Sequence, residues 1–164
     1  MNTAEFTRLD GGLFKAEGIF KPEAILAQAE SILREKLFKG EPMENPKSAA
    51  RFLQMSLANE DNEHFAVLFL NAKHIVVAYE KLFQGTVNQA SVYPRALVQR
   101  AMEHNAAAVI FAHNHPSGDC EPSRADKRIT KDLVDALALI NVTVLDHFVV
   151  SRENWVSLAS QGWL

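Results

Sequence analysis

Apolar residues recur along the chain in two patterns, one helical and one extended. Helical spacing of apolar side chains predicts four helices, at Pro22–Phe38, Pro46–Leu57, Pro94–His104 and Arg124–Ile140. Short, nearly continuous apolar runs predict strands at Glu63–Leu70, His74–Tyr79, Ala107–Ala112 and Val142–Val150. Residues 1–20 have no clear period, so a short strand or a loose arm is expected there.

The order of these elements predicts an α/β fold, a mixed β-sheet flanked by helices. The strands at 63–70 and 74–79 are separated by the short polar turn Asn71–Lys73, which predicts a hairpin. The helix at 94–104 joins one strand to the apolar strand at 107–112, as in a β-α-β crossover. A length of 164 residues suggests one domain with a small appendage. We therefore expect an N-terminal helical arm at 1–45 and a main domain at 46–164.

Composition changes this picture little but excludes some classes. The net charge of −3 lacks the strongly basic balance of many nucleic-acid-binding domains. Cys120 is the single cysteine, so no internal disulfide can form. No apolar leader follows Met1 and no apolar run is long enough to span a membrane, so a cytoplasmic protein is expected.

Candidate chemistry is concentrated directly after the strand at 107–112. Residues two apart in extended chain point to the same side, so His113 and His115 can direct their rings to one point. Pro116, Ser117 and Gly118 then turn the chain. Asp126 falls in the first turn of the next helix and can point back at the strand end. Two imidazoles and one carboxylate around an open position are the ligand set of a catalytic zinc site.

A plainer interpretation exists for part of this motif. Ser123 is a natural N-cap, and Ser123-x-x-Asp126 is close to a capping box, in which the acid serves only the helix start. Capping and metal binding are compatible, because one carboxylate oxygen can bind metal while the helix holds the side chain. Cys120 lies in the same loop as an alternative soft ligand, but a surface-loop thiol is expected.

The motif resembles that of a known superfamily. His113-x-His115-Pro116 followed by Ser123-x-x-Asp126 resembles the JAMM motif of the JAB/MPN metalloproteases, and AHNHPSGDCEPSRAD resembles their RadC branch. The similarity continues through EHFAVLFLNAKH and VTVLDHFVVS and covers roughly residues 46–164. It implies a JAB/MPN (cytidine-deaminase-like) core with one Zn²⁺ per chain, bound by His113, His115 and Asp126.

The resemblance also implies catalytic roles and a reaction. Glu63 matches the superfamily's general base, with Glu80 as the alternative, and Ser123 matches the serine that stabilises the oxyanion. The implied function is zinc-dependent hydrolysis of a peptide or isopeptide bond in a protein or peptide substrate. A non-catalytic zinc-bearing interaction domain is the alternative. Asp146 and His147 resemble a pair typical of the RadC branch and are candidates for supporting the zinc ligands.

Partners follow from the resemblance only in outline. The RadC family name associates the chain with DNA repair, although a helix-hairpin-helix region is not recognisable in the first 45 residues. The apolar stripe of the helix at 22–38 packs either on the main domain or on a second copy in a homodimer. The segment Lys81–Asn88 is expected to run from a strand into a turn, and its Phe83-Gln84-Gly85-Thr86 part is either a substrate-groove element or an ordinary turn. A nucleobase deaminase is rejected, because the sequence has neither His-x-Glu at the motif nor a cysteine pair.

Overall fold

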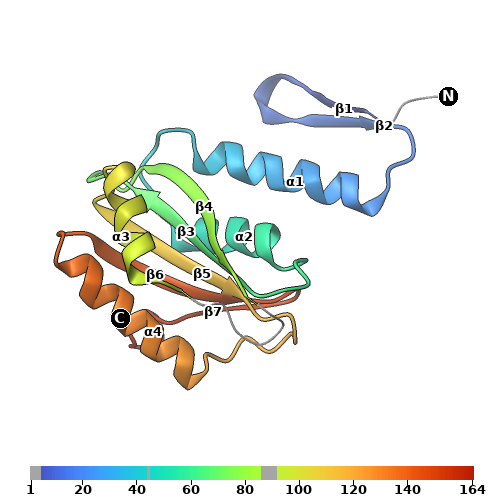
Figure 1. Cartoon of the computed structure of the whole chain (residues 1–164). Helices are drawn as coiled ribbons and strands as arrows, with labels where there is room; N and C mark the ends of the chain where they lie inside the picture. The colour runs from blue at the N-terminus through green and yellow to red at the C-terminus, as the bar shows by residue number, and fades with distance from the viewer. Residues whose placement is uncertain (1–4, 44, 86–91) are drawn as a thin grey trace.

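The computed structural model describes residues 5–43, 45–85 and 92–164 (Figure 1). The strands are β1 Glu5–Arg8, β2 Phe14–Glu17, β3 His64–Leu70, β4 Val76–Gln84, β5 Ala108–Asn114, β6 Thr143–Val150 and β7 Trp155–Ser157. The helices are α1 Pro22–Leu37, α2 Pro46–Leu57, α3 Pro94–Glu103 and α4 Arg124–Ala138, with one 3₁₀ turn at Asp10–Gly12.

A five-stranded mixed sheet forms the centre, in the order β4-β3-β5-β6-β7. β3 is antiparallel to both of its neighbours, β5 and β6 are parallel, and β7 is antiparallel to β6. This arrangement confirms the predicted α/β fold with a mixed sheet. The parallel neighbours are joined through α4, whereas the crossover through α3 connects β4 to β5 with β3 between them.

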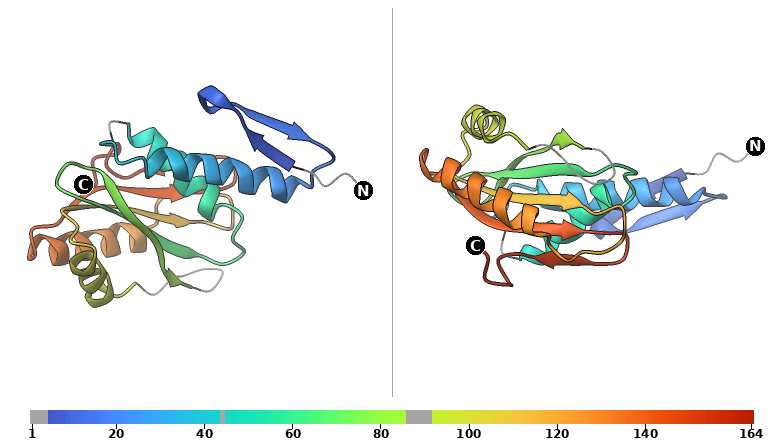
Figure 2. Two further views of the ribbon diagram at one scale, coloured as in Figure 1. Left: turned by 90° about the horizontal axis from the view of Figure 1, so that it is seen from above. Right: turned by 60° about the horizontal axis from the view of Figure 1, so that its bottom comes forward.

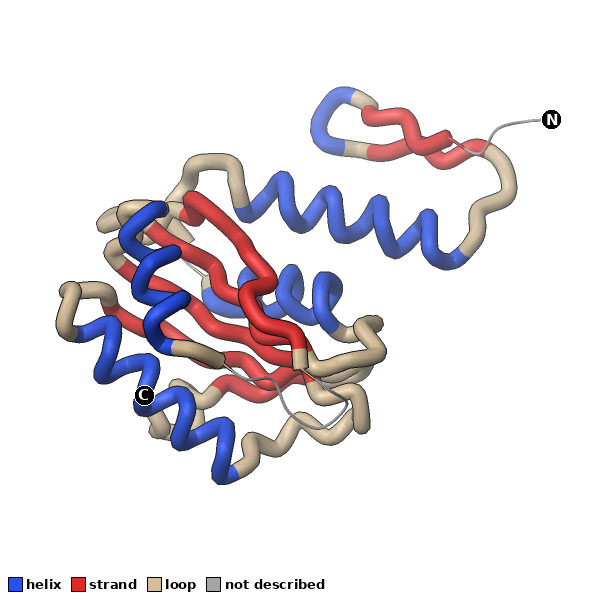
Figure 3. Tube along the Cα trace, in the orientation of Figure 1, coloured by secondary structure: helices blue, strands red, loops and turns tan. Residues whose placement is uncertain are grey.

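Helices cover both faces of this sheet, and the strand residues alternate between the two resulting cores (Figures 1 and 3). On β3, Ala66, Leu68 and Leu70 pack with the apolar side of α2. Phe65, Val67 and Phe69 point the other way and pack with α3 and α4. The period of two in an extended strand is therefore what separates the two cores. His113 belongs to the same face of β5 as Phe111, which is the face covered by α4.

The N-terminal segment lies on the α2 side, away from α3 and α4 (Figure 2). β1 and β2 form a separate two-stranded antiparallel sheet, and α1 packs against α2. Leu37, at the end of α1, is the buried residue that joins this helix to the core. Most side chains of the hairpin are exposed, which explains why residues 1–20 carry no clear apolar period. The division of the chain at residue 45 stays a prediction.

Local signals set the element boundaries. Asn45 caps α2 as predicted, because its Oδ1 accepts a hydrogen bond from the Lys47 N–H at 2.9 Å. The strand expected at 74–79 and the one expected from Lys81 form a single strand, β4, which ends at Gln84 because it keeps pairing with β3 across a bulge between Phe65 and Ala66. The predicted groove segment runs into Thr86, which lies outside the described residues. No helix in the described ranges combines the length and apolar character needed to cross a membrane.

Packing of α4 onto the sheet is expected to dominate local stability. Leu133 is completely buried, whereas Leu139, just after the helix, is 85% exposed. Leu133→Ala should lower the free energy of unfolding by about 2–5 kcal/mol, since a cavity remains between helix and sheet. Leu139→Ala is the matched control and should change it by less than about 0.5 kcal/mol. Urea denaturation of both variants measures the difference, and equal effects would contradict this packing.

Candidate metal centre

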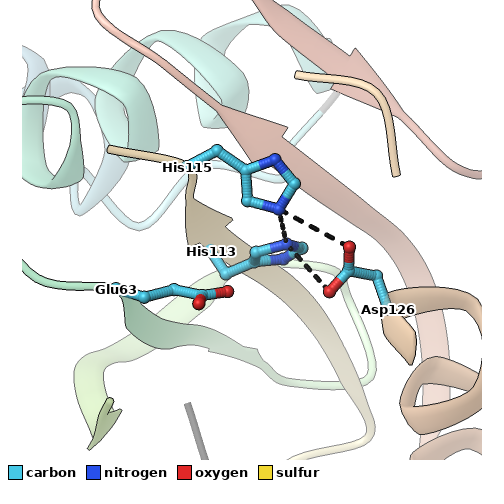
Figure 4. A group of neighbouring side chains, drawn as sticks. All are labelled: Glu63, His113, His115 and Asp126. Carbon is cyan, nitrogen blue, oxygen red and sulfur yellow. Dashed lines mark hydrogen bonds and ion pairs between the residues drawn. The ribbon is translucent and has the colours of Figure 1, made fainter. Parts of the chain in front are cut away.

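Four side chains converge at the end of β5 that faces α4 (Figure 4). One ligand atom from each of Glu63, His113, His115 and Asp126 can be chosen so that all four atoms lie within 4.8 Å of one another. Figure 4 shows Glu63 approaching His113 from the side opposite Asp126. Glu63 and His113 are buried, and the other two are half-buried. These four residues could hold a metal ion, because they bring two imidazoles and two carboxylates to one point. We refer to Glu63, His113, His115 and Asp126 as the metal group.

The strand geometry brings the two histidines together. His113 lies on β5, and the backbone N–H of His115 still donates to the Val150 carbonyl of β6 at 2.9 Å. The extended backbone therefore continues past the strand end, and both rings fall on the α4 side. Their Nε2 atoms lie 3.0 Å apart.

The start of α4 brings Asp126 to the same point. Its Oδ1 lies 3.3 Å from His113 Nε2, and its Oδ2 lies 3.5 Å from His115 Nε2. The capping box is also present: Asp126 Oδ2 accepts from the Ser123 N–H at 2.7 Å, and Ser123 Oγ accepts from the Asp126 N–H at 3.1 Å. Capping thus holds the carboxylate in place without using Oδ1. The two interpretations of this motif are compatible in the structure.

The electrostatics of the group favour a cation. Burial alone would raise the pKa of Asp126, but the adjacent rings of His113 and His115 outweigh it and hold that pKa well below its usual range. The interaction with Asp126 raises the pKa of His115. Burial raises the pKa of Glu63, whose side chain is buried.

The tautomer of His115 supports the same conclusion. Its Nδ1 lies 2.7 Å from the carbonyl oxygen of Asp119. A carbonyl only accepts, so Nδ1 carries the proton and, in the neutral ring, Nε2 carries the lone pair. That lone pair points at the Nε2 of His113 across 3.0 Å, a contact that needs a proton or a metal ion between the nitrogens.

Asn114 positions Glu63, a role that the sequence did not indicate. Its side chain points away from the two histidines and is buried. Its Oδ1 accepts from the His64 N–H at 2.7 Å, and its Nδ2 donates to the Asn62 carbonyl at 3.0 Å. These two hydrogen bonds fix the backbone of the residues directly before and after Glu63. The alternation that directs His113 to the metal group therefore directs its neighbour to the loop carrying the carboxylate.

Other candidate residues have different positions. Glu80 lies outside the group, because its carboxylate bonds to Arg100 Nε at 2.8 Å and to His104 Nε2 at 2.5 Å. The expectation of a surface thiol at Cys120 is wrong: the side chain is buried, and its Sγ donates to the Asn154 carbonyl at 3.2 Å. Cys120 is not part of the four-residue group.

Asp146 and His147 contact different parts of the protein, because neighbouring residues of a strand point to opposite faces of the sheet. His147 Nε2 lies 2.8 Å from His113 Nδ1, so His147 contacts a member of the metal group. Burial lowers the pKa of His147 well below its ordinary value. Asp146 instead accepts from Ser157 Oγ at 2.7 Å and from the Ala159 N–H at 3.1 Å, and so holds the C-terminal segment.

Asp146→Ala is therefore expected to destabilise the fold and to leave metal binding unchanged. Its removal leaves a buried hydroxyl and two backbone N–H groups without their acceptor, which should lower the free energy of unfolding by about 2–3 kcal/mol. Thermal unfolding and metal titration of the variant measure the two effects. A loss of metal affinity without a loss of stability would contradict this placement.

Comparison with known proteins agrees with the geometry. The family model described as a RadC-like JAB domain matches residues 43–163. This chain belongs to the RadC-like JAB domain family. The matched span contains the whole five-stranded sheet and all four residues of the metal group.

Several relatives of similar sequence are named UPF0758 proteins. A UPF0758 protein of Alcanivorax borkumensis is 53% identical over 88% of this chain and 66% of its own length. One of Nitrosomonas eutropha is 48% identical over 98% of this chain and 71% of its own length. One of Vibrio cholerae is 49% identical over 85% of this chain and 88% of its own length. The chain thus spans about two thirds of the first two relatives.

Proposed function

We propose that this RadC-like JAB domain is a zinc-dependent hydrolase of the JAMM type that cleaves a peptide or isopeptide bond. The observation that carries the proposal is the convergence of Glu63, His113, His115 and Asp126, whose ligand atoms lie within 4.8 Å of one another. Family membership supports it, because the motif residues of the JAMM pattern are the ones that meet in space.

The donor set fits a catalytic zinc ion. His113, His115 and Asp126 supply two nitrogens and one oxygen, which is a set of three protein ligands that leaves one position open. When bound, zinc supplies a Lewis acid that lowers the pKa of a water molecule to about 7 and polarises a carbonyl. Other divalent ions that accept imidazole and carboxylate ligands are the alternatives that metal analysis distinguishes.

Glu63 is assigned to proton transfer rather than to ligation. Glu63 approaches His113 from the side opposite Asp126 (Figure 4), and Asn114 holds the backbone on both sides of Glu63. A carboxylate in that position accepts a proton from the attacking water and returns it to the leaving amine.

Ser123 is assigned to the oxyanion. Its Oγ accepts the Asp126 N–H, so its hydroxyl proton remains available to donate. A hydroxyl next to the metal group then stabilises the negative charge that develops on the substrate carbonyl oxygen.

Metal analysis followed by a substrate screen tests the proposal. Purified protein is analysed for bound metals and then incubated with peptides and isopeptide-linked peptides, with cleavage followed by mass spectrometry. We expect about one zinc per chain and cleavage that a chelator abolishes. Zinc without cleavage of any substrate would favour the non-catalytic interaction domain, and absence of metal after zinc is offered would reject both.

A further inference from the structure

A chain of hydrogen bonds runs behind His113, on the side away from the metal group. His113 Nδ1 lies 2.8 Å from His147 Nε2, and His147 Nδ1 lies 2.6 Å from Thr130 Oγ1. Thr130 Oγ1 lies 2.6 Å from the backbone carbonyl oxygen of Asp126. All three side chains are buried, with His147 completely so. The chain of hydrogen bonds thus connects His113 to the backbone of Asp126 without passing through the point where the four ligand atoms meet.

The backbone carbonyl sets the direction of every bond in this chain. A carbonyl oxygen only accepts, so Thr130 must donate its single hydroxyl proton to Asp126. The Thr130 oxygen is then an acceptor toward His147, and the proton between them belongs to His147 Nδ1.

The same logic continues to His113. The partners of the two His147 nitrogens are Thr130 and His113, and the ring packs edge-on against Phe65 and Phe111, so neither nitrogen is hydrogen-bonded to a carboxylate. A buried charged ring without such a partner is costly, so His147 is neutral and its Nε2 accepts. The proton in the last bond therefore lies on His113 Nδ1. The Nε2 of His113, which faces His115 and Asp126, carries the lone pair.

We infer that Thr130 and His147 are positioning residues that fix His113 in the tautomer whose Nε2 is free to bind a metal ion. The inference deepens the proposed function, because it rests on His113 being a ligand. A histidine binds metal through an unprotonated nitrogen, so a fixed tautomer prepares the site before the ion arrives.

The carboxylate of Asp126 favours the opposite tautomer of His113. Asp126 Oδ1 lies 3.3 Å from His113 Nε2 and would accept a hydrogen bond from that nitrogen if it carried the proton. Without Thr130 and His147, this carboxylate would favour the His113 tautomer that carries its proton on Nε2, the nitrogen that would bind the ion. Thr130 and His147 hold the proton on the far side of the ring.

Thr130→Val is the direct test, because valine keeps the shape of threonine and removes its hydroxyl. His147 Nδ1–H then has no acceptor, which is unfavourable for a buried donor. His147 relieves this by moving its proton to Nε2 and donating to His113, which reverses the last bond. Thr130→Ser keeps the hydroxyl and is the matched control.

Two measurements report the effect. Nitrogen-15 spectra of the metal-free protein should show the His113 proton on Nδ1 in the wild type and in Thr130→Ser, and on Nε2 in Thr130→Val. Zinc affinity, measured by competition with a chelator, should fall by about 10- to 100-fold in Thr130→Val and stay at the wild-type level in Thr130→Ser. His147→Phe keeps an aromatic ring against Phe65 and Phe111 and should lower zinc affinity similarly. It replaces Thr130→Val as the test variant if Thr130→Val does not fold.

The outcomes separate this inference from the proposed function. An unchanged His113 tautomer in Thr130→Val overturns the inference, even if zinc affinity falls, because packing would then explain the loss. Unchanged zinc affinity with a changed tautomer overturns it as well. If the wild type binds no zinc, the proposed function fails, and the inference fails with it as a statement about metal binding.

Discussion

Glu63→Gln is expected to lower hydrolysis by about 10²- to 10⁴-fold while the metal content stays near one ion per chain. Glutamine keeps the size and the hydrogen-bonding reach of glutamate but cannot accept a proton from water. His113, His115 and Asp126 are untouched by the change, and Asn114 still grips the backbone beside residue 63. Steady-state cleavage of the best substrate from the screen, with metal analysis of the same preparation, measures both quantities.

Glu60→Gln is the matched control for this variant. Glu60 lies three residues earlier in the same loop, but its carboxylate pairs with Lys81 and is not part of the metal group. It should keep wild-type activity and wild-type metal content. If Glu63→Gln loses the metal together with activity, Glu63 is a ligand rather than a base. Full activity of Glu63→Gln would show that Glu63 has no part in the reaction.

Asp126→Asn is expected to remove the bound metal. Asparagine can still accept from the Ser123 N–H, so the helix start is kept while the anionic oxygen is lost. Zinc affinity should fall by more than the roughly 10- to 100-fold that loss of a supporting residue costs. Metal analysis and chelator competition measure the loss, and His113→Ala and His115→Ala should give the same result.

Asp135→Asn provides the comparison on the same helix. Asp135 is exposed and pairs with Lys131 four residues earlier, so its loss should leave metal binding unchanged. Thermal unfolding of both variants shows whether the helix start survives. Undiminished metal in Asp126→Asn, or in Asp126→Ala, would show that the ligand assignment is wrong.

Local periodicity was enough to predict most of the elements. Apolar spacing predicted α1, α2, α3 and α4 within a few residues of their ends, and the apolar runs predicted β3, β5 and β6. The two extended runs at 74–79 and from Lys81 were predicted separately, whereas pairing with β3 across a bulge joins them in one strand, β4. The hairpin of β1 and β2 was not resolved by the sequence, because its exposed side chains carry no alternation.

The sequence predicted the members of the metal group through spacing and resemblance together. Spacing of two in a strand places His113 and His115 on one side, and both rings fall there in the structure. Glu63 lies 50 residues before His113, so only the resemblance connected them. Their meeting follows from the pairing of β3 with β5, in which Phe65 lies opposite His113.

The residues that support the group were decided by the tertiary structure. Asn114 and Thr130 look like ordinary polar residues in the sequence, and Asp146 looks as good a supporter of His113 as His147. Alternation along β6 directs His147 to the face covered by α4 and Asp146 to the other face, where Asp146 bonds to Ser157 of β7. The packing of α4 brings Thr130 into contact with His147. The sequence alone determined which residue types stand at the strand end and helix start. The partners of those residues depend on contacts between distant elements, which local spacing does not encode.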